Sequence, residues 1–100
     1  MTTDTTFNTQ DKIKTKKPKM YAVMLINDDY TTMEFVMYVL QQVFGKSEES
    51  AFQIMLSVHQ KGKGEAGLYN FQVAEQKAYE TKMLAKQNNY PLQVTLEEIS

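Results

Sequence analysis

The sequence has no cysteine, no tryptophan and no arginine, and it has a single histidine, His59. Without cysteine there is no disulfide, thiol nucleophile or thiolate ligand, and one imidazole is too few for a histidine-rich metal site. No apolar run approaches the roughly 18 residues of a membrane span, and no secretion signal is visible, so we expect a cytoplasmic protein. Most enzyme classes rely on nucleophiles or metal ligands that are absent here, and no cofactor or metal is predicted.

The 100 residues are 42% hydrophobic with a net charge of −1, which is typical of one small domain. A chain of this size buries roughly 60 to 70% of its unfolded surface, which is enough for one core but not for a deep cleft. The charge is uneven, at +3 over residues 1–19 and −4 over residues 20–100. The first segment has too few apolar side chains to offset the entropy of ordering, so we predict a disordered N-terminal extension (1–19) and a folded domain (20–100). Its lysines lack interleaved aromatics and are weak evidence for nucleic-acid binding.

The hydrophobic pattern predicts three strands and three helices. Seven apolar residues, 20–26, are typical of a buried strand, and Thr31 and Glu34 form a capping box for a helix that ends near residue 44. The rest of the pattern predicts a helix from Ser47 to Gly62, a short strand over 65–69, a helix from Asn70 to about Asn88 and a half-exposed strand over 93–99. The order β-α-α-β-α-β indicates a two-layer α+β fold, a three-stranded antiparallel sheet packed with three helices.

Two groups of residues are candidates for a site. Asn27, Asp28 and Asp29 follow the first strand directly, where loops commonly carry function, although the same residues are also ordinary turn formers. Met55, Val58 and His59 share one helix face through i+3 and i+4 spacing. This face is either part of a binding site or packed in the core. Met33 and Val36 repeat this pattern one helix earlier.

The enzyme hypotheses fail on spacing. Ser57 and His59 are two apart on a helix and point away from each other, so they cannot form a nucleophile and its base. A metal site at Asp28, Asp29 and His59 lacks a further ligand. The Gly62-Lys63-Gly64 stretch does not have the spacing of a phosphate-binding loop.

The sequence resembles the ClpS family of adaptor proteins over roughly residues 18–98. The motifs that carry the resemblance are Met20-Tyr21, Asn27-Asp28-Asp29-Tyr30-Thr31, Met33-Glu34-Phe35-Val36, Leu56-x-Val58-His59, Gly62-Lys63, Gly67, Val73-Ala74-Glu75 and Pro91-Leu92. The resemblance implies a non-catalytic adaptor of the bacterial cytoplasm. Such an adaptor captures proteins with an N-terminal Phe, Leu, Tyr or Trp and delivers them to the ClpA unfoldase for degradation by ClpAP.

The resemblance also implies roles for individual residues. It places Asn27, Asp28, Thr31 and His59 at the substrate's α-amine and backbone, and oxygen and imidazole acceptors suit an ammonium group that has only donors. It assigns the side-chain pocket to Asp29, Met33, Val36, Met55, Val58 and Leu92, in which two flexible thioethers adapt to several large side chains. It assigns contact with the ClpA N-terminal domain to Gln72, Glu75 and Lys77.

Two residues depart from the family pattern, and one alternative stays open. Thr32 stands where the family usually has proline, which would lock the first helical position, and Gln72 stands where some relatives have Glu. We expect a monomer with no nucleic-acid or membrane partner. The alternative is a general protein interaction domain that resembles the C-terminal domain of the ribosomal stalk protein.

Overall fold

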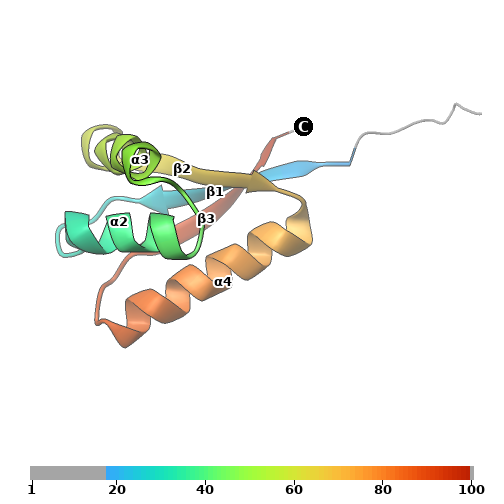
Figure 1. The fold of residues 1–100 in the computed structure, drawn as a ribbon. Helices are drawn as coiled ribbons and strands as arrows, with labels where there is room; N and C mark the ends of the chain where they lie inside the picture. The colour runs from blue at the N-terminus through green and yellow to red at the C-terminus, as the bar shows by residue number, and fades with distance from the viewer. Residues whose placement is uncertain (1–17, 100) are drawn as a thin grey trace, which may run out of the picture.

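The computed structural model describes residues 18–99 and shows three helices and three strands (Figure 1). Most of the expected N-terminal extension, residues 1–17, lies outside the described residues. The elements are β1 (Met20–Ile26), α2 (Met33–Gln42), α3 (Glu48–Lys61), β2 (Lys63–Tyr69), α4 (Phe71–Gln87) and β3 (Gln93–Ile99). The predicted order β-α-α-β-α-β is confirmed. Within residues 18–99, no helix is both long and apolar enough to cross a membrane.

The sheet has the order β2-β1-β3, and both neighbours pair with β1 in antiparallel orientation. The central position of β1 fits its unbroken apolar sequence, because a strand pairs with each of its edges and residues on both of its faces are buried. Val23 and Leu25 are completely buried on the face that joins the main core, while Ala22 and Met24 are buried on the other face. The register against β2 shifts between Val23 and Met24, whereas the register against β3 is regular.

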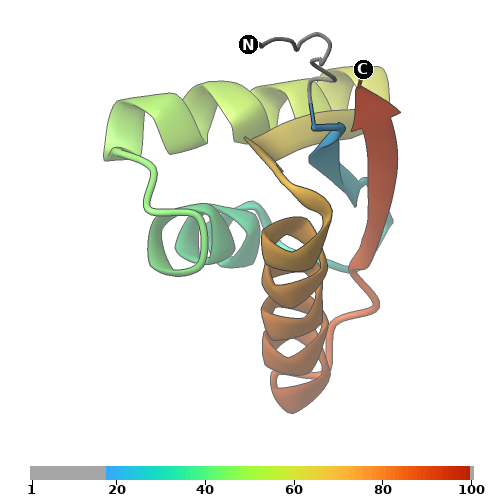
Figure 2. The same cartoon turned by 90° about the vertical axis from the view of Figure 1, so that its right-hand side faces the viewer.

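All three helices cover one face of the sheet, and α2 and α4 lie side by side (Figures 1 and 2). The alanines Ala74, Ala78 and Ala85 are buried along α4, so this small-residue stripe lets the helix lie close to the strands. Helix α3 approaches β2 at Gly64, which is buried beneath it. Helix α2 contributes Phe35, Val36, Val39 and Leu40 to the main core.

The N-cap residue predicted from the sequence is correct for two of the three helices. Ser47 and Asn70 are the N-caps of α3 and α4, as predicted. The predicted capping box at Thr31 and Glu34 is wrong, because the N-cap of α2 is Thr32, whose hydroxyl accepts from the Phe35 amide at 3.1 Å. The Thr31 hydroxyl instead donates to the Asp28 carboxylate at 2.6 Å, a charge-assisted bond that draws it away from the helix. Thr32 is therefore a cap and not the first helical residue.

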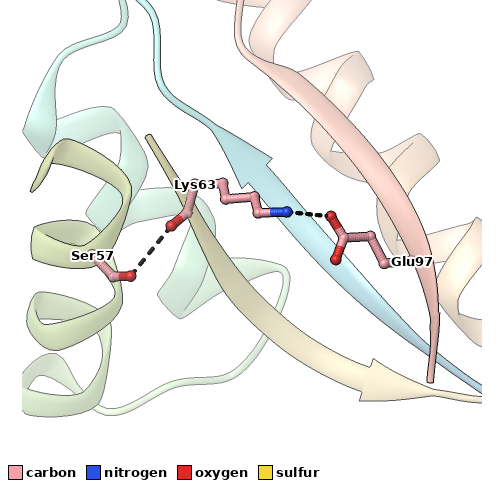
Figure 3. A network of polar contacts seen from close by, with 3 residues as sticks. All are labelled: Ser57, Lys63 and Glu97. Carbon is pink, nitrogen blue, oxygen red and sulfur yellow. Dashed lines mark hydrogen bonds and ion pairs between the residues drawn. The ribbon is translucent and has the colours of Figure 1, made fainter. Parts of the chain in front are cut away.

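The opposite face of the sheet carries a polar pair. Lys63 on β2 and Glu97 on β3 form an ion pair of 2.8 Å that crosses above β1 (Figure 3). Both side chains are about half exposed, so the pair contributes little to stability. Its place above β1 keeps charge on the face that no helix covers.

Candidate functional site at the β1–α2 loop and the end of α3

The loop between β1 and α2 is organised by the side chain of Asp28. Its Oδ1 accepts the backbone N–H groups of Tyr30 at 2.8 Å and Thr31 at 2.7 Å, and its Oδ2 accepts the Thr31 hydroxyl at 2.6 Å. These bonds close the chain into a tight turn directly before the N-cap of α2. The turn-forming role that the sequence left open for Asp28 is therefore real, and any role in binding adds to it.

The same bonds set the charge of Asp28 and its remaining bonding capacity. Burial by itself raises the pKa of this carboxyl, but the hydrogen bonds from Thr31 and Tyr30 outweigh it, so the net pKa lies below its usual 3.8. A carboxylate has about four lone-pair positions, and the three bonds leave about one on Oδ2. Asp28 is thus an anion at neutral pH with room for one further donor.

A backbone hydrogen bond joins this loop to the end of α3. The Asn27 N–H donates to the Gly62 carbonyl at 2.9 Å. Gly62 is the C-cap of α3 in the left-handed region at φ 89°, and its own N–H donates to the Val58 carbonyl at 3.1 Å. His59 lies in the last turn of α3, so the two segments that the sequence selected meet at one end of the domain.

The polar candidates differ in exposure. Asn27, Asp29 and His59 are exposed, whereas Asp28 and Thr31 are half-buried in the turn. Among residues 18–99, neither the Asn27 amide nor the His59 imidazole has a hydrogen-bond partner for its side chain. Both side chains are therefore available to an incoming group.

Four of the apolar candidates are buried in the main core, and one is exposed. Val36, Met55, Val58 and Leu92 all belong to the main core and are at most 6% exposed. Met33, the first residue of α2, is 50% exposed. A hollow of about 560 Å³ lies elsewhere, lined by Met37, Ser47, Glu48, Glu49 and Phe52.

The partner-binding candidates on α4 fall into two groups. Gln72 and Glu75 line a surface hollow of about 450 Å³ together with Gln76 and Tyr79. The sequence analysis missed the last two residues, although the four follow the i, i+3, i+4, i+7 spacing of one helix face. Lys77 does not line this hollow, because its half-buried ammonium donates to the Val43 carbonyl at 2.8 Å.

The structure does not bring together the residues of the enzyme hypothesis. The Ser57 hydroxyl donates to the Lys63 carbonyl at 3.2 Å on the neighbouring strand, as Figure 3 shows, and it is not paired with His59. Among the described residues, no group of three or more carboxylates and imidazoles is gathered in a way that could hold a metal ion.

Comparison with known proteins identifies the family of the chain. The family described as "ATP-dependent Clp protease adaptor protein ClpS" matches residues 16–95, a span that holds every candidate site residue. The chain belongs to the ClpS family. It is 54% identical to the ClpS adapter protein of Phenylobacterium zucineum over 90 residues, which are 90% of this chain and 83% of that relative. The ClpS adapter protein of Caulobacter vibrioides NA1000 is 50% identical over the same shares of each chain.

A solved ClpS-family structure also resembles the fold. It is described as Agrobacterium tumefaciens ClpS2 bound to L-phenylalaninamide, and its sequence is 41% identical to this chain. The TM-score is 0.79, with 83% of this chain and 100% of that chain covered. The chain is thus a Clp protease adaptor by family, with the α+β fold that its sequence predicts.

Proposed function

We propose that this ClpS-family adaptor binds the free N-terminal residue of substrate proteins, namely Phe, Leu, Tyr or Trp, and delivers them to the ClpA unfoldase for degradation by ClpAP in the bacterial cytoplasm. The observation that carries the proposal is the phenylalaninamide bound by the Agrobacterium tumefaciens relative. Phenylalaninamide combines a free α-ammonium, a benzyl side chain and a carboxamide. These are the three groups that an N-terminal phenylalanine presents.

The polar part of the site suits an ammonium group. An ammonium has three donors and no acceptor, and the Asn27 amide oxygen, the free position on Asp28 Oδ2 and a neutral His59 nitrogen are acceptors. The Thr31 hydroxyl gives its hydrogen to Asp28, so it offers only lone pairs and suits a backbone N–H of the substrate. The anionic state of Asp28 at neutral pH strengthens this recognition, because bonds between ions are charge-assisted.

The apolar part of the site suits a large side chain that is not branched at its β-carbon, such as that of Leu, Phe, Tyr or Trp. We assign the side-chain pocket to Val36, Met55, Val58 and Leu92, which are buried in the main core, and to Met33, which is half-exposed. Two or three charge-assisted hydrogen bonds contribute about 1.5 to 3 kcal/mol each, and the buried side chain adds about 1.5 to 3 kcal/mol. After association costs of at least about 4 kcal/mol, at most about 8 kcal/mol remains, so the affinity is on the order of micromolar at the upper end of this range.

Delivery uses a different surface in this proposal. Gln72, Glu75, Gln76 and Tyr79 form one exposed face of α4, and we assign the ClpA N-terminal domain to this face. Tyr79 is 58% exposed, and an exposed aromatic among polar residues is typical of an interface anchor. Because α4 carries this face and the β1–α2 loop carries the substrate site, both partners can bind at once.

The test compares two peptides that differ only at the α-amine. A fluorescent peptide that begins with free Phe should bind, and its N-acetylated twin should bind at least about tenfold more weakly, because acetylation removes the charge and two donors. Substitution of His59 by Ala should weaken the free peptide but not the acetylated one. Equal binding of both peptides would contradict the proposal and favour the general interaction domain, which has no reason to distinguish them.

A further inference from the structure

Tyr30 is the one residue of the motif at positions 27–31 to which neither the family resemblance nor the proposed function gives a role. Its side chain is 78% exposed, the highest fraction among the large apolar and aromatic side chains of residues 18–99. Within that range its ring forms no aromatic pair and its hydroxyl forms no hydrogen bond. The ring therefore contributes no packing to the core, although the residue lies in the middle of the candidate loop.

The backbone of Tyr30 is held in place by Asp28. The Tyr30 N–H donates to Asp28 Oδ1 at 2.8 Å, and the same oxygen accepts the Thr31 N–H at 2.7 Å. The ring thus projects from a fixed point in the turn, and only its two side-chain torsions stay free. A tyrosine held in this way offers a large amphipathic contact surface at a low cost in conformational entropy.

Two residues that anchor the substrate in the proposed function precede and follow Tyr30. There, the free position on Asp28 Oδ2 accepts the α-ammonium, and the Thr31 hydroxyl accepts a backbone N–H. The first backbone N–H after the α-ammonium belongs to the substrate's second residue. This residue is then bonded to the immediate neighbour of Tyr30 in the chain. Because consecutive Cα atoms are about 3.8 Å apart, its side chain starts within reach of the tyrosine ring.

We propose that the Tyr30 ring contacts the side chain of the substrate's second residue and favours an aromatic side chain there. Aromatic pairs gain from offset-stacked or edge-to-face contact in addition to the burial of apolar surface. The Asp28 and Thr31 anchors bind backbone groups, so they do not distinguish one second side chain from another. The inference rests on the proposed function, which concerns the first residue of the substrate, and adds a preference at the second.

The test is a double-mutant cycle between the protein and its peptide ligand. Two fluorescent peptides begin with free Phe-Tyr or free Phe-Ala and are otherwise identical. Each is titrated into the wild type, Tyr30→Ala, Tyr30→Phe and the control Tyr38→Ala. Tyr38 is a second exposed tyrosine, 49% exposed on α2, and it is not among the residues assigned to the site.

The wild type should bind the Phe-Tyr peptide roughly two- to tenfold more tightly than the Phe-Ala peptide. Tyr30→Ala should lose this ratio, whereas Tyr30→Phe, which keeps the ring, and Tyr38→Ala should retain it. Tyr30→Ala keeps the backbone N–H that Asp28 accepts, so its affinity for the Phe-Ala peptide should stay close to that of the wild type.

Each other result overturns the inference. Equal affinity of the wild type for both peptides means that the second side chain is not recognised. A ratio that persists in Tyr30→Ala assigns the recognition to another residue, and an equal loss for both peptides shows that Tyr30 only shapes the loop. The same ratio for the N-acetylated peptides shows contact that does not depend on the anchors. If the wild type does not distinguish free from acetylated Phe-Ala peptide, the proposed function itself fails and the inference falls with it.

Discussion

The close approach of α3 to β2 at Gly64 makes Gly64→Ala the most informative single substitution. A β-carbon at Gly64 would lie 2.8 Å from Val58 Cγ2, 3.0 Å from the Ile54 carbonyl oxygen and 3.3 Å from the Val58 nitrogen. Two of these atoms belong to the backbone of α3 and cannot rotate away. The added methyl group must therefore push α3 from the sheet, and Val58 and His59 move with it.

The expected cost follows from two opposing effects. Overpacking of a close-packed core costs about 1 to 3 kcal/mol. Alanine also restricts the unfolded chain more than glycine does, and this effect raises the free energy of unfolding by about 0.4 to 1 kcal/mol. The net loss in the free energy of unfolding is about 1 to 2 kcal/mol, which lowers the thermal midpoint of a domain of this size by roughly 4 to 16 °C.

Thermal unfolding followed by circular dichroism measures this loss, with Glu65→Ala as the control. Glu65 is the next residue on β2 and is exposed, so its substitution should change stability by less than about 0.5 kcal/mol. Adding Val58→Ala removes the methyl group that the new β-carbon meets, so the double-mutant cycle should show a favourable coupling of at least about 0.5 kcal/mol. A midpoint for Gly64→Ala that matches the control, or a strictly additive cycle, would refute the argument.

Three further predictions concern the loop and the rim of the site. Since the folded pKa of Asp28 is depressed, its stabilisation is present above pH 3.8 and is lost as pH falls through the folded value. The difference in urea midpoint between wild type and Asp28→Asn should therefore shrink only below about pH 4, and a difference that stays constant to pH 2 would contradict this. Thr32→Ala should cost about 1 kcal/mol through loss of the N-cap, whereas Thr32→Ser should cost little; equal unfolding curves would show that the cap is not needed. Met33→Ala should open the half-exposed rim and admit peptides that begin with Ile or Val, and a titration with unchanged selectivity would oppose that role.

Much of the architecture could be predicted because its signals are local. The seven apolar residues of β1, the strand pattern of β3 and the caps Ser47 and Asn70 each act over a few neighbours in the chain, and these elements are confirmed, although the burial of β3 alternates only over residues 93–96. The start of α2 was wrong by one residue because two threonines compete for the same role. Only the position of Asp28, which takes the Thr31 hydroxyl, decides that Thr32 becomes the cap.

The site depends on contacts that are distant in sequence. Periodicity places Met55, Val58 and His59 on one face of α3, and composition excludes thiol chemistry, both without a structure. The hydrogen bond from Asn27 to Gly62, which brings the loop to the end of α3, joins residues that are far apart in the chain and follows from the pairing of β1 with β2.

The same distinction holds for the lysines. Lys77, Lys82 and Lys86 look alike in the sequence of α4, and helical spacing alone cannot rank them. Residue types and spacing by themselves determined the elements, their order and the kinds of chemistry available. Tertiary packing alone decided that Lys77 meets the end of α2 and that Gly64 lies against α3, because both contacts depend on how separate helices and strands come together.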